Sequence, residues 1–301
     1  MDLSTASGVL TPAAPFDFEQ SLDFLGMFAP TRGEQTLAPR TLTKAVMIGG
    51  QPLVFRMAGA GSADAPRLEY TLFAAAPITP ETQAAAEDRI GFYLSLDDDL
   101  RPFYALGAAD PAFAPVIRRL YGYHQVKFLT PFENATWAIL SQRNPMPVAQ
   151  KQKLALAARF GGTLTVDGTA YTAFPEAAQL ADVPPATLRE VVNNDRRTEY
   201  LAAAARAFST VDESWLRAAP YAEVEAWLRG IKGIGAWSAE FILLRGLGRL
   251  DRVPITEERL IAAVSQRYGN GQALPPAEVA RIAAGYGPWQ GYWAHYLRAT
   301  A

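Results

Sequence analysis

The stretch from residue 221 to residue 248 constrains the fold more than any other part of the chain. It reads YAEVEAWLRGIKGIGAWSAEFILLRGLG, in which two amphipathic segments flank Gly230, Gly233 and Gly235. Glycine adopts positive φ without strain and lets another backbone come close. Ile231 and Ile234 lie between these glycines and are expected to anchor the turn in a core. The pattern predicts two helices joined by a tight glycine turn.

This turn also has the chemistry of a phosphate-binding site. The second helix is expected to begin near Ala236, so its first N–H groups lack partners within the helix. Such N–H groups bind anions, and Lys232 adds a positive charge on the turn. A glycine turn that serves packing alone is common, and it is the density of glycine that favours phosphate binding here. The residues predicted to bind are Gly230, Lys232, Gly233, Ile234 and Gly235.

The N-terminal part, residues 1–110, has the pattern of a small α+β domain. Residues 42–57 alternate apolar and polar side chains around a Gly49-Gly50 pair, which predicts a β-hairpin. Residues 67–74 predict a further strand of an antiparallel sheet. A proline and a glutamate at positions 80 and 81 begin a predicted helix.

The remaining part, residues 111–301, consists mainly of short helical segments that follow one another. Many of them begin at a proline, as at Pro131 and Pro147, and end at glycine. Residues 162–175 are expected to form a loop or a short ribbon. The chain is therefore predicted to be α+β, with an N-terminal antiparallel sheet domain and a larger all-helical domain.

Composition excludes several classes of protein. The chain has no cysteine, so it has no disulfide, thiolate metal site or cysteine nucleophile. With His124 and His295 as its only histidines, no metal site made of side chains is predicted. No apolar run approaches the roughly 18 residues that span a bilayer, and the N-terminus lacks the features of a signal peptide. We therefore expect a cytoplasmic protein with no membrane partner.

Charge is distributed unevenly along the chain. The net charge is −2, yet the residues from Val126 onward include 19 Lys and Arg against 16 Asp and Glu. The residues before them include 9 basic and 14 acidic side chains. This difference permits the C-terminal part to face an anionic partner.

Several segments, taken in order, resemble one known family. They are PFDF at 15–18 with LDF at 22–24, TPFE with AILSQ within 130–142, the glycine turn, and GPWQGY at 287–292. Together they resemble the helix–hairpin–helix DNA glycosylase superfamily, and most closely its 3-methyladenine-DNA glycosylase II branch. The ordered set covers nearly the whole chain.

The resemblance implies a function in base-excision DNA repair. The hairpin is expected to hold double-stranded DNA, and a damaged base, expected to be alkylated, is flipped into a pocket. A carboxylate then assists hydrolysis of the N-glycosidic bond and leaves an abasic site. The resemblance also implies a monovalent cation on the backbone carbonyls of Arg229, Ile231 and Ile234, and no other cofactor. We expect a monomer associated with the nucleoid.

The catalytic carboxylate is the point where this sequence departs from the family. The family places an aspartate shortly after the second hairpin helix, and here no aspartate occupies that place. Alignment backward from the next helix puts Glu258 there, with Glu257 in front of it, whereas alignment forward from Pro254 puts Thr256 there. Glu258 is preferred, because the apolar face of that helix then keeps the family's register. Acidic residues at a helix start also serve as simple caps.

The predicted base pocket is aromatic. By resemblance it is lined by Phe24, Trp237, Phe241 and Trp289, whose rings suit a flipped base. Arg259 lies where the family has an aromatic ring, and a cation there opposes a cationic base. Trp237 replaces the Schiff-base lysine of bifunctional members, so no lyase activity is expected.

The segment after the first core helix is expected to fill the gap left by the flipped base. Arg143 is the first candidate for this wedge and Asn144 the second, since both lie in the family's wedge loop. Two alternatives to the enzyme remain at this point. One is a non-catalytic protein that binds damaged DNA and has lost the aspartate, and the other is a helical scaffold that contacts a protein.

Overall fold

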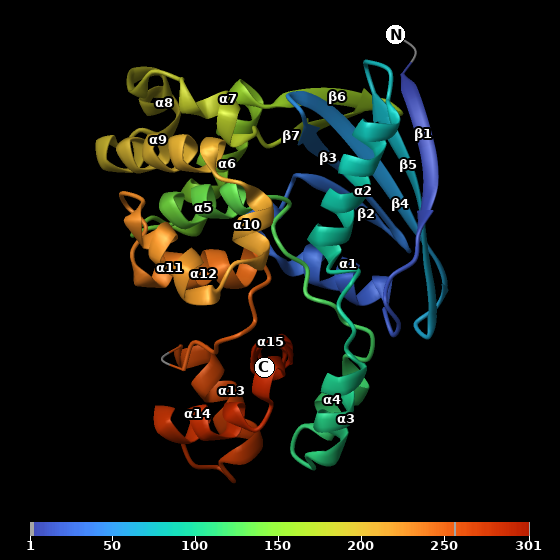
Figure 1. Ribbon diagram of the computed structural model, residues 1–301, viewed down its shortest axis with the longest axis vertical. Coiled ribbons are helices and arrows are strands. Elements are labelled where there is room, and N and C mark those ends of the chain that lie inside the picture. The colour runs from blue at the N-terminus through green and yellow to red at the C-terminus, as the bar shows by residue number, and fades with distance from the viewer. Residues whose placement is uncertain (1–2, 256, 301) are drawn as a thin grey trace.

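A computed structural model describes residues 3–255 and 257–300 of the chain (Figure 1). Its N-terminal part holds a five-stranded antiparallel sheet in the order β1-β5-β4-β3-β2. The strands are β1 (Ser4–Leu10), β2 (Gln35–Ala38), β3 (Thr41–Ile48), β4 (Gln51–Ser62) and β5 (Ala65–Ala74). Two helices accompany the sheet, α1 (Phe18–Met27) and α2 (Pro80–Leu94). The predicted α+β class with an N-terminal antiparallel sheet is confirmed.

The sheet is built on the predicted hairpin of β3 and β4. Gly49 and Gly50 form its turn with φ of 59° and 78°, the positive values that a two-residue hairpin turn requires. One face of the sheet packs against α1 and α2 through a core that includes Leu42, Phe55 and Ile90. The edge strands β1 and β2 were not predicted, because apolar and polar residue types do not alternate along STASGVL and QTLA, although burial alternates along both strands in the structure.

A two-stranded ribbon covers the opposite face of the sheet. It consists of β6 (Gly162–Val166) and β7 (Thr169–Ala173), joined by a turn at Asp167 and Gly168. Leu164, Val166 and Tyr171 pack on Met47 and Val54, while the threonines between them face outward. Residues 111–301 are therefore not wholly helical, which corrects the all-helical description. Of the two forms expected at 162–175, a loop or a short ribbon, the structure has the ribbon.

Helices α5 to α12 form the main helical core. They are α5 (Pro131–Leu140), α6 (Met146–Phe160), α7 (Ala177–Ala181), α8 (Pro185–Val192), α9 (Asp195–Thr210), α10 (Glu213–Ala218), α11 (Tyr221–Gly230) and α12 (Ala236–Arg245). The central helix α5 is buried along its whole length. Thr130 caps α5 by accepting a hydrogen bond from the Glu133 N–H at 3.0 Å, and Pro131 follows at the first helical position.

A second cluster joins helices that are far apart in sequence. These are α3 (Arg101–Ala109), α4 (Ala114–Arg119), α13 (Glu258–Tyr268), α14 (Pro276–Ala284) and α15 (Gln290–Ala299), which lie together at the lower end of the molecule in Figure 1. Phe103 of α3 packs on Tyr286 and Tyr296 at ring-centroid distances of 6.3 and 5.1 Å. The sequence division at residue 110 thus runs through this cluster, because α3 packs with the C-terminal helices.

Four buried charges join the sheet to the helical core. Lys153 of α6, which is 0% exposed, contacts Glu133 of α5 at 2.6 Å and also Glu34. Lys44 of β3 contacts Glu34 at 2.8 Å. Burial raises the pKa of Glu34, but Lys153 and Lys44 outweigh burial, and its pKa lies below the usual value. The two lysines and two glutamates balance in charge, so each ion is paired within the interface.

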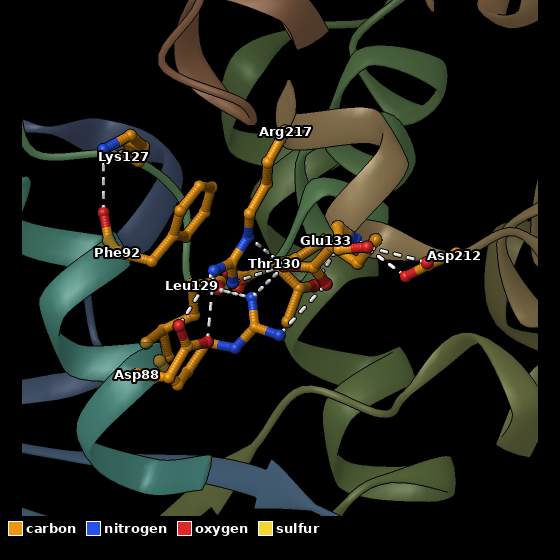
Figure 2. A network of polar contacts seen from close by, with 11 residues as sticks. Asp88, Phe92, Lys127, Leu129, Thr130, Glu133, Asp212 and Arg217 are labelled. Carbon is orange, nitrogen blue, oxygen red and sulfur yellow. Dashed lines mark hydrogen bonds and ion pairs between the residues drawn. The ribbon is translucent and has the colours of Figure 1, made fainter. Parts of the chain in front are cut away.

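A second polar network bridges α2 and α10 nearer the surface (Figure 2). Arg217 points at Asp88, with its Nη1 3.0 Å from Oδ1, and lies 4.0 Å above the Phe92 ring. Arg89 donates two hydrogen bonds to Glu213, at 2.7 and 3.0 Å, and one to the carbonyl of Leu129. These contacts fix α10 against the sheet domain at a second place.

Replacing Lys153 by methionine is expected to lower the free energy of unfolding by about 3–5 kcal/mol, because it leaves buried carboxylates without their counterion. The measurement is urea denaturation at neutral pH. Arg281→Gln is the control, since its pair with Glu278 is exposed and is expected to contribute under about 1 kcal/mol. Equal effects of the two changes would contradict the role of the buried cluster.

Candidate functional site

The predicted hairpin forms as expected. Helix α11 ends at Gly230 and α12 begins at Ala236. Ile231 and Ile234 are buried, and the Ile234 N–H donates to the Ile231 carbonyl at 3.0 Å. The turn is thereby anchored in the core while the N-terminus of α12 faces outward. The cation site expected on the carbonyls of Arg229, Ile231 and Ile234 remains a prediction.

Two glycines of the turn have different reasons to be glycine. Gly233 has φ of +94°, and a Cβ there would lie 2.2 Å from Cγ of Tyr200. Gly235 has an ordinary φ of −85°, is exposed, and a Cβ there would meet nothing within 4 Å. The protein's own fold therefore requires glycine at 233, whereas at 235 the open space is available to something outside the chain.

A broad groove of about 1010 Å³ runs along this turn. Its walls come from the turn, the beginning of α9 and the loop after α5. The basic side chains on its lining are Arg143, Arg196, Arg197, Arg229 and Lys232. Lys232 also pairs with Glu199 on α9. The excess of basic groups on an open surface suits a polyanion.

The predicted wedge loop lies against the turn. Gln142 donates to the Gly233 carbonyl at 2.8 Å, and Arg197 donates to the Gln142 carbonyl at 2.9 Å. Arg143 follows with φ of +46° and an exposed side chain. Asn144 is instead tied back to the Leu140 carbonyl at 2.8 Å. Of the two wedge candidates, Arg143 is the one whose side chain projects into the groove region.

A chain of aromatic rings leads from the turn into the protein. Trp237 is 63% exposed and lies parallel to Phe241, with centroids 5.4 Å apart and an interplanar angle of 4°. Phe241 contacts Phe128 at 6.3 Å, and Phe128 contacts Phe28 at 5.5 Å. Phe28 stacks on Phe24 at 4.9 Å. We call these five rings the aromatic wall.

The aromatic wall joins three of the four predicted pocket rings, namely Phe24, Trp237 and Phe241. The fourth, Trp289, packs at 6.2 Å from Phe103 and at 6.0 Å from Tyr292, in the C-terminal cluster. Among the described residues, no aromatic pair joins Trp289 to the wall. Arg259, on the first turn of α13, is exposed and makes no ion pair within the described ranges.

The carboxylates at the start of α13 have unequal surroundings. Glu258 is exposed, whereas Glu257, the residue that precedes the helix, is half-buried and pairs with Arg298 of α15 at 2.6 Å. Glu240 on α12 is half-buried as well, and burial together with the nearby carboxylates of Glu225 and Glu257 raises its pKa. Thr256, the alternative catalytic position, lies outside the described residues.

Sequence reasoning missed Phe28, Phe128 and Arg245. Arg245 follows Phe241 by four residues and Trp237 by eight, so the three share one face of α12. The sequence shows that spacing, so Arg245 could have been predicted. The sequence does not show that Phe28 and Phe128 join these rings, because only tertiary packing brings α1 and the segment before α5 against α12.

Comparison with known proteins agrees with this geometry, although no family model matches the chain. A DNA-3-methyladenine glycosylase of Bacillus subtilis is 27% identical over 207 residues, which are 68% of this chain and 68% of that protein. DNA-3-methyladenine glycosylase 2 of Escherichia coli is 30% identical over 164 residues, 54% of each chain. The 3-methyladenine DNA-glycosylase structure from Archaeoglobus fulgidus has a TM-score of 0.80 at 20% identity and covers 97% of both chains.

The fold and the glycine hairpin resemble those of the helix–hairpin–helix DNA glycosylases. In sequence the chain is similar to proteins named DNA-3-methyladenine glycosylase, and in fold it is similar to a 3-methyladenine DNA-glycosylase structure. Among its described residues, no helix is both long and apolar enough to cross a membrane.

Gly233→Ala is expected to lower the free energy of unfolding by about 1–3 kcal/mol, since it combines positive φ with a collision against Tyr200. Thermal or urea unfolding of the purified variant measures this change. Gly235→Ala, which meets neither obstacle, is expected to leave stability within about 0.5 kcal/mol of wild type. If Gly233→Ala leaves the free energy of unfolding unchanged, the turn does not adopt this conformation.

Proposed function

We propose that the chain is a monofunctional DNA glycosylase that flips a damaged base and hydrolyses its N-glycosidic bond, leaving an abasic site. The observation that carries the proposal is the placement of α12. Its N-terminus lies in the basic groove, and the same helix presents Trp237 and Phe241 to the aromatic wall. Relatives named DNA-3-methyladenine glycosylase support an alkylated base as the first substrate to examine.

The groove would hold the duplex by its backbone. The N–H groups at the start of α12 meet a phosphate, and the arginines around the turn add sequence-independent attraction. Arg143 would enter the base stack from the neighbouring loop, since its long planar side chain fills a vacated base position. The displaced nucleotide would then meet rings on which a base can stack.

Bond cleavage would depend on a carboxylate at the start of α13. Loss of the base builds positive charge on the sugar, and a fixed anion in a site without water stabilises that charge. The same carboxylate can orient the attacking water. The family's register favours Glu258, but burial favours Glu257, because Glu257 is half-buried and held by Arg298 whereas Glu258 is exposed.

The proposal excludes a lyase step at the hairpin. Bifunctional members use a lysine at the position of Trp237, and an indole cannot form a Schiff base. Lys232 is on the turn itself and pairs with Glu199. The expected product is an intact strand that carries an abasic site.

Gly235→Ala is expected to weaken binding to duplex DNA roughly tenfold, because the added methyl group occupies the space that a phosphate would enter. Fluorescence anisotropy at two salt concentrations measures the change. Gly91→Ala on α2 is the matched control, since its Cβ also meets nothing within 4 Å. If the Gly235→Ala variant binds duplex DNA with unchanged affinity, the hairpin turn is not part of the DNA interface.

Free-base release from methylated duplex DNA tests the reaction itself. Glu257→Gln is expected to slow release by roughly 10²–10³-fold with DNA affinity retained, because it removes the anion and keeps the shape. Glu258→Gln is the paired variant, and the larger loss identifies the catalytic group.

If neither glutamine variant slows release, the carboxylate assignment is wrong. If wild-type protein binds damaged duplexes but releases no base from any of them, the chain is a non-catalytic damaged-DNA-binding protein.

A further inference from the structure

Behind the aromatic wall lies a buried cation without an anion. Arg245 is 7% exposed, and its guanidinium carbon lies 4.7 Å from the Phe24 ring centroid and 4.9 Å from that of Phe28. Its Nη2 has no hydrogen-bond partner, and no described carboxylate lies within ion-pair distance of it. The two rings offset only part of the cost of removing a guanidinium from water.

Two further polar atoms in the same place lack partners. Tyr123 and His295 are 2% and 6% exposed, and their rings stack at 5.1 Å. The Tyr123 hydroxyl and His295 Nε2 make no hydrogen bond. His124 shows the contrast, because both of its ring nitrogens contact backbone carbonyls, at 2.6 and 2.9 Å.

The three groups gather around one ring of the base site. Phe24 lies 6.2 Å from Tyr123 and 6.3 Å from His295, and it also covers Arg245. Phe24 is only half-buried, so the ring that covers these atoms is itself partly open to solvent. Arg245 shares its face of α12 with Trp237 and Phe241. A base that reached the inner rings of the wall, Phe24 and Phe28, would therefore come close to the Arg245 guanidinium.

The charge of this cluster is fixed near neutral pH. Burial lowers the pKa of Arg245 to about 10, so the guanidinium stays protonated. Burial, with Arg245 and Arg298 nearby, lowers the pKa of His295 well below its usual value, so the imidazole stays neutral. The cluster therefore offers the guanidinium donors of Arg245, the hydroxyl of Tyr123, a neutral imidazole nitrogen of His295 and one positive charge.

We propose that Arg245, Tyr123 and His295 read the edge of the flipped base, and that the site takes an uncharged base with acceptor atoms rather than a cationic N-alkylated purine. This inference rests on the proposed glycosylase function and names its substrate class. Guanidinium donors match a carbonyl oxygen beside a ring nitrogen. A base that carries a positive charge is repelled by Arg245 in a site of low dielectric.

Two probe duplexes distinguish a preference for an uncharged base from a preference for a cationic base. One contains hypoxanthine, which is neutral and presents O6 and N7 as acceptors. The other contains 7-methylguanine, which keeps O6 but carries a methyl group and a positive charge at N7. The readout is the ratio of kcat/KM for base release from the two duplexes, measured on the same preparation, so that partial unfolding cancels.

Wild-type protein is expected to release hypoxanthine faster than 7-methylguanine. Arg245→Met, which keeps length and removes charge and donors, is expected to lower this ratio by about tenfold or more. Arg159→Met is the matched control, because Arg159 also lies over a phenylalanine ring but far along α6, and its ratio is expected to stay at the wild-type value.

His295→Phe is the second variant, in case Arg245→Met does not fold, and a fall in the ratio is again expected. A wild-type preference for 7-methylguanine, or a ratio that Arg245→Met and His295→Phe leave unchanged, would overturn the inference while base release upheld the glycosylase function. Absence of release from both probe duplexes and from methylated DNA would overturn both.

Discussion

The buried ion cluster of Lys44, Glu34, Lys153 and Glu133 is the interaction on which the arrangement of the site depends. Lys153 also donates to the Pro30 carbonyl at 3.2 Å, so the segment between α1 and β2 is held against α6. Phe24 and Phe28 lie on or beside α1 at the start of this segment. Because buried ions must keep their partners, the sheet domain cannot shift without losing them, and two rings of the aromatic wall keep their place against α12.

Helix α12 takes part in both contacts that the proposed reaction requires, the contact with the DNA backbone and the contact with the flipped base. Its N-terminus follows a turn whose backbone is shaped by Gly233 and left open at Gly235. The spacing of four residues places Trp237, Phe241 and Arg245 in line along one face of the helix, which runs from the exposed Trp237 to the buried Arg245. A rigid helix that carries both the DNA contact and the base contact sets their separation. The wedge loop is tied to the same turn through Gln142, so the three parts form one unit.

The local parts of the site were predictable and the distant ones were not. The hairpin, the strands around Gly49 and Gly50 and the cap of α5 follow from turn and capping chemistry, which acts within a few residues. The edge strands β1 and β2 were not predicted, because each pairs with a neighbouring strand on one side only and its hydrophobic pattern is weak. Trp289 stays a predicted pocket residue by resemblance, and its ring packs on Phe103 of the C-terminal cluster. At the start of α13, Glu257 is half-buried and Glu258 is exposed. The sequence does not show this difference, because both residues are glutamates and they are adjacent.

The sequence by itself determined the helical hairpin at 221–248 and the β-hairpin around Gly49 and Gly50, because glycine spacing and helix termini dictate local backbone geometry wherever the rest of the chain lies. It also determined that thiolate and disulfide chemistry are absent. Only the tertiary structure decided which rings meet in the aromatic wall, that Glu257 meets Arg298, and that Arg245 is buried without an anion. The physical reason is that burial and pairing arise between segments that are far apart in the sequence, 41 residues apart for Glu257 and Arg298, and no local pattern records which segments will touch.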